Sequence, residues 1–472
     1  MNKRIYLILE VKKRELDSRC YFAIKACLQD YSVVITKKES FYRNKNFLKS
    51  GYVFLKSYGP NYFEEIKKIK ALGHKICAMD EEGIMYFNEE DYKQKRIFEK
   101  NLDYIDYIFT WGNDDYKLVT SSLKKFKEKI FQTGSPRIDI LKKPVNGIYH
   151  EEAKEIKKKH NNFFLFNTFF TYTNHFYSSN NYFKKRNFAE ALQSVGFSKD
   201  SIVYKNGIEM EKLQRNTLNE SITFVEKFAA KFKNKKLIIR PHPSENHKIW
   251  HDLSNKFENV ETIYDERNAC SWILASEFAI SSNCTTSVES FLLNKLNYNF
   301  RPFKNEIVEF KLPKITGINI SSADDMIKKI ENFNNFNSDD EIFKKNRNKI
   351  LPDLNFYFEN LNENICSINN IINVIKNLEE SNIKKKNDNR GGYPLFLFLR
   401  TLRKINLFRF RIINFLKKNK NNNLDFGTQK FPDLTEKELD DKIKNISNKM
   451  KLSEQFKVVE KFPGAFLIEK EL

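Results

Sequence analysis

Strand-like runs alternate with helix-like segments along most of the chain, and this alternation constrains the fold more than any other feature. The strand-like runs of the first part lie at 4–11, 31–36, 51–56, 75–80, 104–112 and 129–136. The pattern then restarts, with strand-like runs at 161–170, 235–241, 259–265 and 276–283 and helices near 215–233 and 285–294. Alternation at this spacing predicts two α/β domains, each built on a doubly wound parallel sheet.

Length and local composition divide the chain further. A chain of 472 residues is too long for one ordinary core, so we expect one domain at 1–150 and a second at 151–380. The stretch 381–392 is rich in Lys, Asn and Gly and is typical of a linker. In 393–420, apolar residues recur every three or four positions among basic residues, without an acid. We therefore expect a helical tail at 393–472, whose basic amphipathic part either lies on an anionic membrane or packs on the core.

The charge balance narrows the class of partner. The formal net charge is +21, which favours anionic partners such as acidic sugars, nucleotide donors or an anionic lipid surface, and we do not expect nucleic acid. The six cysteines form no CxxC pair, which indicates reduced thiols. The N-terminus is typical of a first strand and not of a signal peptide, and no segment is apolar enough to span a bilayer. We expect a cytoplasmic protein that is either free or peripheral at the inner face of the plasma membrane.

The sequence Arg-Pro-His-Pro follows one predicted strand of the second domain. Pro241 and Pro243 stiffen this corner, and Arg240 and His242 place basic side chains at the carboxyl end of the strand. Ligands of open α/β sheets bind at this end, and both side chains can donate to phosphate oxygens. The corner therefore indicates an anion site, although two prolines can also serve only to shape a loop.

A polar turn follows another strand of the second domain. Its side chains crowd the start of a helix, where free backbone N–H groups and the positive helix end favour an anion. Glu289 lies about one turn into that helix and could accept from ribose hydroxyls. The expected donor-binding residues at the turn are Ser281, Ser282, Asn283, Thr285 and Thr286, with Thr285, Thr286 or Ser287 as the N-cap.

The first domain has an acidic run at a strand end. Asp80, Glu81 and Glu82 are adjacent and precede Gly83, so one of them could be a general base, or all could form a solvated loop. Further polar residues lie after other predicted strands and could contact an acceptor. These secondary candidates are Arg14, Glu15, Gly134, Ser135, Arg137, Asn174 and His175. Since no HExxH motif or similar ligand pattern is present, we expect no metal and no cofactor.

Several of these blocks resemble the surface carbohydrate biosynthesis protein family of bacteria. The most specific are RPHPSENHKIW at 240–250 and the block around NCTTSVE at 272–295, together with TGSPRIDIL at 133–141 and a patch at 428–435. More distantly, three motifs are similar to those of bacterial sialyltransferases and capsule Kdo transferases. The resemblance implies an α/β fold of two Rossmann-like domains facing across a cleft, the GT-B arrangement, with a basic helical tail.

The resemblance also implies roles for particular residues. Glu81-Glu82-Gly83 matches the motif whose first carboxylate is the general base, and His242-Pro243 matches the motif that binds the CMP phosphate of the donor. Either Thr285-Thr286 or Ser281-Ser282 matches the hydroxyl pair that meets the same phosphate. It follows that the chain is expected to transfer a Kdo-like or sialic-acid-like sugar from a CMP-linked donor to a glycan or lipid-linked glycan. Two alternatives are a CDP-polyol phosphotransferase of teichoic-acid type and a non-catalytic carbohydrate- or nucleotide-binding protein.

Overall fold

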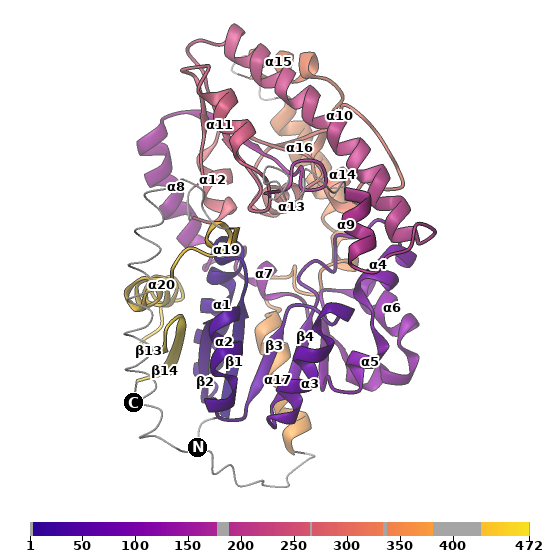
Figure 1. Ribbon diagram of the computed structural model, residues 1–472. Helices are drawn as coiled ribbons and strands as arrows, with labels where there is room; N and C mark the ends of the chain where they lie inside the picture. The colour runs from indigo at the N-terminus through magenta and orange to yellow at the C-terminus, as the bar shows by residue number, and fades with distance from the viewer. Residues whose placement is uncertain (1–2, 177–187, 265–266, 334–337, 381–425, 472) are drawn as a thin grey trace, which may run out of the picture.

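The computed structural model describes residues 3–176, 188–264, 267–333, 338–380 and 426–471. These residues form two α/β domains, one above the other in Figure 1, as the alternation of strands and helices predicted. The chain crosses between the domains near α8 (Gly147–His160) and returns to the first domain before α17 (Ser367–Glu380). No described helix is both long and apolar enough to cross a bilayer.

The sheet of the first domain has a parallel centre. Its strand order is β13-β14-β2-β1-β3-β4-β5-β6. The order changes direction between β1 and β3, which both pair in parallel with their neighbours. A ligand of such a sheet binds beyond the carboxyl ends of the strands at this point. The parallel strands are β1 (Lys3–Leu9), β2 (Tyr31–Lys37), β3 (Tyr52–Leu55), β4 (Lys75–Met79), β5 (Tyr107–Thr110) and β6 (Ile130–Gln132).

Helix α1 (Lys12–Cys27) is the central helix of the first domain. It begins directly after β1 and is buried along most of its length, because it packs against β2, α7, α17 and α20. Its first turn faces the second domain. The other helices of this domain are α2 (Lys38–Asn44), α3 (Phe63–Ala71), α4 (Glu89–Arg96), α5 (Glu99–Leu102), α6 (Asn113–Ser122) and α7 (Pro136–Asp139), with short 3-10 turns at Lys45–Phe47, Pro60–Tyr62 and Lys124–Lys129.

The sheet of the second domain is parallel throughout. Its strand order is β12-β11-β10-β7-β8-β9, so the order changes direction between β7 and β10. Counted along the chain, this is the 3-2-1-4-5-6 order of dinucleotide-binding domains, whose ligands bind at the switch point. The strands are β7 (Phe163–Asn167), β8 (Lys236–Arg240), β9 (Val260–Thr262), β10 (Ala279–Ser281), β11 (Asn297–Phe300) and β12 (Ile318–Ile320).

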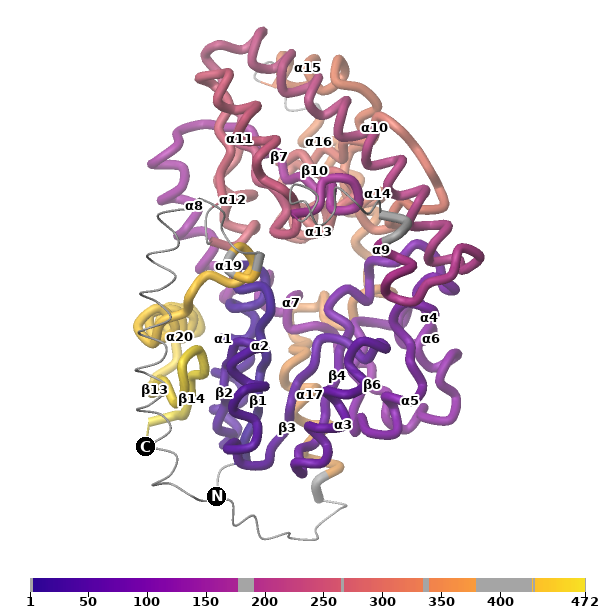
Figure 2. The backbone as a smooth tube through the Cα atoms, viewed as in Figure 1, coloured from indigo at the N-terminus to yellow at the C-terminus, as the bar shows by residue number. Residues whose placement is uncertain are grey.

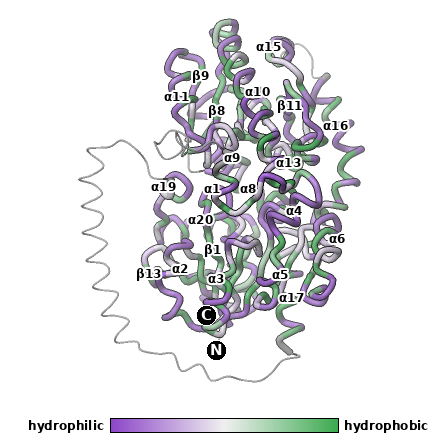
Figure 3. Tube along the Cα trace, turned by 45° about the vertical axis from the view of Figure 1, so that its right-hand side comes forward, coloured by the Kyte–Doolittle hydropathy of each residue, from purple (hydrophilic) through white to green (hydrophobic). Residues whose placement is uncertain are grey.

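Helix α10 (Ile202–Lys231) is the longest helix of the second domain and is amphipathic. Ser201 caps it by accepting a hydrogen bond from the Tyr204 N–H, and buried residues recur every three or four positions. Figure 3 shows the resulting mixture of hydrophobic and hydrophilic positions along it. The other helices are α9 (Phe188–Ser194), α11 (Lys248–Ser254), α12 (Ala269–Ala275), α13 (Thr285–Leu292), α14 (Lys311–Thr316), α15 (Ala323–Asn332) and α16 (Ser338–Ile350), with a 3-10 turn at Asp353–Phe356.

The elements at both ends of the predicted second domain, 151–380, differ from the prediction in the domain on which they pack. Helix α8 begins before residue 150 but packs on α12 of the second domain. Helix α17 belongs to the predicted second domain but packs on α1 and α7 of the first. Asp139 fixes the segment 360–368, where the chain returns to the first domain. Its carboxylate accepts hydrogen bonds from the Ser367 and Ile368 N–H groups and from the Asn360 side chain.

The expectation of a wholly helical tail at 393–472 was wrong for its last part. The described residues contain α19 (Phe426–Lys430) and α20 (Glu436–Lys449), followed by β13 (Phe456–Phe462) and β14 (Ala465–Lys470). β14 pairs antiparallel with β2 and extends the first sheet, because its apolar residues are buried there. The predicted linker at 381–392 and the basic stretch 393–420 lie outside the described residues.

Candidate active site in the interdomain cleft

Two adjoining cavities lie at the carboxyl ends of the strands. The larger, of about 400 Å³, is lined by residues of both domains, including Arg137, His242 and Thr285. The smaller, of about 220 Å³, lies within the first domain beside Lys56 and Tyr62. Both are lined by a shared set of charged residues, which are Arg14, Glu82, Lys95 and Arg96. Acidic and basic side chains therefore meet where the two cavities join.

Glu81 is the most strongly constrained carboxylate of the acidic run. It is buried after β4, and its Oε1 lies 2.5 Å from Arg19 Nη2, which is also buried. Arg137 donates to the Glu81 backbone carbonyl at 3.3 Å. Burial opposes ionisation, but the surrounding arginines and Lys56 outweigh it and lower the pKa of Glu81. Glu81 is therefore ionised and held in a fixed ion pair.

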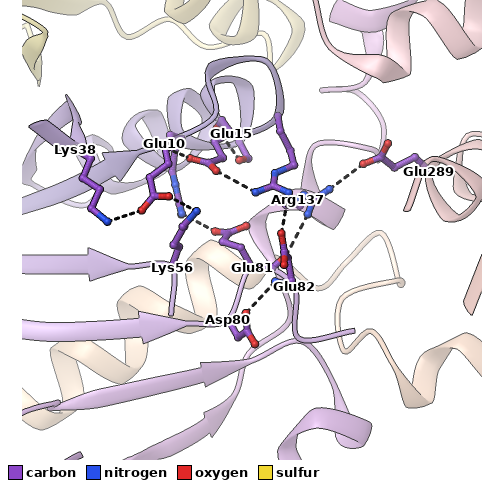
Figure 4. Close-up of polar contacts among 12 residues, drawn as sticks. Glu10, Glu15, Lys38, Lys56, Asp80, Glu81, Glu82, Arg137 and Glu289 are labelled. Carbon is purple, nitrogen blue, oxygen red and sulfur yellow. Dashed lines mark hydrogen bonds and ion pairs between the residues drawn. The ribbon is translucent and has the colours of Figure 1, made fainter. Parts of the chain in front are cut away.

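Glu82 is the carboxylate that borders both cavities. Its side chain is 46% exposed, so a substrate can reach it. Arg96 Nη2 lies 2.6 Å from one oxygen and Arg14 Nη1 lies 3.3 Å from the other. Although desolvation opposes ionisation, Arg96 and Arg14 hold the pKa of Glu82 well below its usual value. Figure 4 shows the run beside α1, with Asp80 lowest.

Asp80 differs from its two neighbours. Its carboxylate is buried, accepts the Glu82 N–H at 3.1 Å and has Arg96 Nε at 3.7 Å. Burial raises the pKa of Asp80, and Arg96 offsets this only in part. The Asp80 carbonyl accepts from the indole N–H of Trp111 at 2.7 Å. Asp80 thus fixes the loop, and the acidic run is not a solvated loop.

The start of α1 supplies a second row of charges. Glu15 is buried and accepts the Glu10 N–H at 2.8 Å, which fixes the strand end before the helix. Arg14 lies between Glu15, at 3.4 Å, and Glu82. Glu10 is paired with Lys38 at 3.0 Å and with Lys56. The sequence indicated Arg14 and Glu15 but not Glu10 and Lys56. Glu10 follows β1 and Lys56 follows β3, and these strands become neighbours only in the folded sheet.

His242 lines the larger cavity from the second domain. Its Nδ1 accepts the Ser244 N–H at 3.2 Å, so the neutral ring carries its hydrogen on Nε2. Burial, and next the positive charge of Arg14, lowers the pKa of His242 to about 3. The ring lies edge-on to Phe169, with centroids 5.2 Å apart. His242 is therefore a neutral hydrogen-bond donor at the cavity wall.

Glu245 organises the corner and was missed in the sequence. It is buried and accepts from the His242 N–H at 3.3 Å, the Thr168 hydroxyl at 2.7 Å and the Trp250 indole at 3.0 Å. Burial raises its pKa, while these hydrogen bonds oppose the rise. The sequence of this loop did not indicate that the Glu245 carboxylate would accept hydrogen bonds from several of its residues.

Asn174 and His175 also belong to this corner. Asn174 is buried and donates to the Asn246 carbonyl at 3.0 Å, so its role is to hold the loop. His175 lines the larger cavity, and burial and the charge of Lys430 lower its pKa to about 4. Of this pair, only His175 is placed to meet a ligand.

The polar turn after β10 leads into α13. Asn283 adopts a left-handed conformation with φ of 47° and accepts the Phe310 N–H at 2.8 Å. The N-cap is Cys284, and in the described structure no side chain caps the helix, so the prediction of a hydroxyl N-cap was wrong. Asn283, Cys284 and Thr285 line the larger cavity. The first turn of α13, which has no side-chain cap, therefore borders this cavity at Thr285, and the start of a helix favours an anion.

The two candidate hydroxyl pairs occupy different places. Thr285 borders the cavity, whereas Ser281 and Ser282 are buried behind it. Thr286 is also buried, and its hydroxyl and that of Ser281 have no hydrogen-bond partner among the described residues. Asn167 pairs with Ser281 between β7 and β10, and both polar atoms of its side-chain amide also have no hydrogen-bond partner among the described residues. Unsatisfied polar groups therefore gather beside the switch point.

Other expected site residues have structural roles. Arg240 donates to the Arg267 carbonyl at 2.9 Å and does not line either cavity. Ser135 exchanges hydrogen bonds with Asn360, and a Cβ on Gly134 would lie 2.4 Å from the same side chain. These two residues therefore fix the point where the chain returns to the first domain, and they line neither cavity.

Arg137 and Glu289 join the two domains. Arg137 Nη2 lies 2.9 Å from Glu289 Oε1, and both side chains are largely buried. The pair crosses from α7 to α13, so Glu289 is engaged by a protein cation. A second contact crosses the cleft mouth, where the rings of Phe87 and Phe310 stack with centroids 5.0 Å apart. The two domains are therefore in direct contact beside the larger cavity.

No described group of three or more His, Cys, Asp or Glu side chains is arranged to hold a metal ion. The positive groups at the cavity are instead arginines, a lysine and the start of α13. A set of this kind can bind and stabilise a phosphate. The opposite wall, with Glu82, can accept a hydrogen bond or a proton.

No family model matches the chain, and no curated protein matches it. Among solved structures, the wall teichoic acid polymerase TagF superposes with a TM-score of 0.51 at 11% identity, over 81% of this chain and 90% of that one. A variant of TagF soaked with CDPG gives 0.50 at 12%, over 80% and 89%. The UDP-GlcNAc 2-epimerase from Methanocaldococcus jannaschii gives 0.44 at 12%, over 80% and 100%. The likeness to TagF confirms the predicted GT-B-like fold of two Rossmann-like domains.

Proposed function

We propose that this chain is a glycosyltransferase of bacterial surface polysaccharide biosynthesis that uses a nucleotide-linked donor. One observation carries the proposal: His242 and the uncapped start of α13 line the same cavity, and Glu82 faces them from the first domain. A phosphate-binding wall thus stands opposite a carboxylate, which is the arrangement that transfer from a phosphate leaving group requires.

The donor is a CMP-linked acidic sugar, such as Kdo or a sialic acid. When the bond from its anomeric carbon to the phosphate oxygen breaks, negative charge develops on the leaving CMP. The Nε2–H of His242 and the N–H groups at Thr285 stabilise this charge, while Arg14 adds a full positive charge. Since these groups supply the positive charge, the proposed reaction uses no metal ion.

The acceptor is a glycan or lipid-linked glycan that enters from the first domain. Glu82 is the carboxylate that it meets, because Glu82 borders both cavities while Glu81 is paired with Arg19. A free Glu82 with its low pKa is a weak base. An anionic donor that draws Arg14 toward its phosphate removes one of the two cations from Glu82, which makes the carboxylate more basic.

A second candidate is phosphotransfer from a CDP-linked polyol. The fold likeness to TagF favours it, and a TagF variant was solved after a soak with CDPG. In that reaction, the acceptor hydroxyl attacks the β-phosphorus and CMP again leaves. The same His242 corner would stabilise the leaving CMP, so both candidates use the same cavity.

Donor turnover by the full chain tests the proposal. CMP-Kdo, CMP-sialic acid and CDP-glycerol are each supplied with glycan acceptors, and CMP release is measured together with the ³¹P spectrum of the product. Release from a CMP-sugar with a phosphorus-free product supports glycosyl transfer. A new phosphodiester resonance establishes the second candidate instead. If all three donors bind but none is consumed, the chain is a binding protein.

A further inference from the structure

The smaller cavity, of about 220 Å³, lies at the point where the strand order of the first sheet changes direction. Its walls come from the chain directly after β3 and β4, from the first turn of α1 and from the end of α4. In Figure 2, α1 lies to the left of β3 and β4 and α4 to their right, and all four belong to the lower domain. Ligands of open α/β sheets bind at this position, so the cavity is placed to hold one.

The rim of the cavity, residues 56–62, is fixed by the domain itself. The buried Asn101 side chain donates to the Tyr58 carbonyl at 2.9 Å and to the Gly59 carbonyl at 2.6 Å. A Cβ on Gly59 would lie 3.2 Å from the Lys95 carbonyl oxygen, so the rim approaches the backbone of α4 closely. Because the protein fixes the rim before a ligand arrives, little conformational entropy is lost when one binds.

All four cations of the described residues that line the smaller cavity are paired with protein carboxylates. The pairs are Arg14–Glu82, Arg96–Glu82, Lys95–Asp91 and Lys56–Glu10. A carboxylate or phosphate of a ligand would have to compete with these groups for the cations. It would also come close to Glu82 and to the buried Glu81, which repel it. The pairing therefore disfavours an anionic ligand in this cavity.

The walls of the cavity offer hydrogen-bond acceptors beside hydrogen-bond donors. Asp80 Oδ2 is buried and has no hydrogen-bond partner among the described residues, and Glu82 is accessible to a ligand. The ammonium group of Lys56 and the amide of Asn61, at the exposed rim, can donate. A hydroxyl donates one hydrogen bond and accepts others, so a ring that carries several hydroxyls can use both kinds of group. These walls fit an uncharged sugar.

We propose that the smaller cavity is the acceptor subsite and that it holds one uncharged sugar residue, whose reacting hydroxyl lies at Glu82 where the two cavities join. The inference rests on the proposed function, and it goes beyond it because it states the class of sugar that receives the transferred group. A volume of about 220 Å³ corresponds to about seven waters, which is the space of a single sugar ring.

Donor binding strengthens the preference for an uncharged acceptor. In the proposed reaction, Arg14 turns toward the donor phosphate in the larger cavity, and Glu82 then keeps Arg96 as its partner. The smaller cavity becomes more negative as a result. An anionic acceptor group is repelled more strongly in this state, whereas a hydroxyl of an uncharged sugar gains a better hydrogen-bond acceptor.

Binding of simple glycosides to the full chain tests the subsite. The uncharged probes are the methyl glycosides of glucose, galactose and N-acetylglucosamine, and the anionic probes are those of glucuronic acid and Kdo. Saturation-transfer NMR measures each probe at low and high salt, with and without CMP. At least one uncharged glycoside should bind with an affinity that salt does not change, because it forms no ion pair. Binding of an anionic glycoside alone, with release by added salt, would overturn the inference.

Two cavity variants show where the glycoside binds. Lys56→Met removes a donor from the wall, while Glu10 keeps Lys38 as a partner at 3.0 Å, and Asn61→Ala changes an exposed side chain. Each should weaken glycoside binding by about fivefold to tenfold at a similar melting temperature. The matched control is Lys67→Met, at an exposed lysine of α3 that lines neither cavity, and it should bind as the parent does. Unchanged binding in both cavity variants would show that the sugar lies elsewhere, and the inference would be wrong.

A CMP titration separates this inference from the proposed function. His242→Ala should lose CMP binding and keep glycoside binding. If CMP binds to the parent but no glycoside does, the donor site stands and the inference fails. If CMP does not bind to the parent, the proposed function fails, and the glycoside measurements without CMP still decide whether the smaller cavity holds a sugar.

Discussion

A histidine that burial keeps neutral can donate a hydrogen bond to a phosphate without the desolvation cost of a buried charge. His242 meets this condition, because its Nδ1 accepts from Ser244 and its Nε2 therefore carries the hydrogen. Arg14 and Lys430 lie close enough to disfavour a second proton, while Glu82 opposes them. The same positive neighbours that keep the ring neutral also attract the phosphate.

We predict that His242 stays neutral in the free protein throughout the range from pH 8 to pH 5. Burial and the nearby positive charges lower its pKa to about 3, well under the usual value for histidine. A ¹⁵N NMR titration of the imidazole rings checks this, and addition of CMP should move the titration upward because the phosphate favours the protonated ring. A midpoint near 6.5 in the free protein would contradict the described corner.

Glu82→Gln and Glu81→Gln should have different effects. Glu82 is exposed to both cavities, so Glu82→Gln should reduce turnover by about a hundredfold and leave nucleotide affinity unchanged. Glu81→Gln leaves the buried Arg19 without its partner charge and should lower the free energy of unfolding by about 3 kcal/mol. Steady-state kinetics and urea unfolding measure the two effects. Equal effects of both variants on rate would show that the run works as one unit.

At the scale of secondary structure, the central strands of both sheets could be predicted from sequence. Runs such as 31–36 and 235–241 are apolar, bounded by polar residues and followed by helices, and their strands lie within about a residue of the prediction. The last two strands of the second sheet, β11 and β12, were missed, since Asn297–Phe300 and Ile318–Ile320 are short and contain asparagine. Isolated runs of this kind become strands only because a neighbouring strand pairs with them.

Asp139 offers a test of how elements are joined. It accepts hydrogen bonds from the first two N–H groups of α17 and from Asn360, so it caps a helix that is remote in sequence. Asp139→Ala should lower the free energy of unfolding by about 1–3 kcal/mol and speed proteolysis before α17. The matched control is Asp103→Ala, at an exposed position. Equal stability of the two variants would show that α17 is held mainly by its apolar face.

The site could be predicted only in outline. Strand ends and motif resemblance identified His242, the turn before α13 and the acidic run, because topology gathers such residues at one edge. Which carboxylate is accessible depends on Arg19 and Arg96, whose positions follow from tertiary packing. The hydrogen bond from Gln429 to the Glu245 carbonyl could not be predicted, because nothing local connects two residues almost two hundred positions apart.

At the scale of the whole molecule, the chain end belongs to the fold. β14 extends the first sheet and α20 packs on α1, so truncation after residue 385 would remove strands β13 and β14 and helix α20 from the first domain. A test of the basic stretch 393–420 must therefore keep the full chain and change only its charges.

We propose that 393–420 holds the protein at the inner face of an anionic membrane, where a lipid-linked acceptor would be found. The full chain should then sediment with vesicles rich in anionic lipid, and added salt should release it. Replacing Arg400, Arg403, Lys404 and Arg409 by Gln should weaken binding by about 1 kcal/mol for each charge. Equal, salt-insensitive sedimentation of both proteins would show that this stretch packs on the core.

The central claim is that the phosphate of a cytidine nucleotide binds between His242 and the start of α13. A crystal structure of the full chain with CMP measures this directly. The account predicts a phosphate within about 3 Å of His242 Nε2 and of a first-turn N–H of α13. Another cavity, of about 460 Å³, lies beside Lys328 and Lys329 in the second domain. A phosphate bound there, with the cleft empty, would contradict the account.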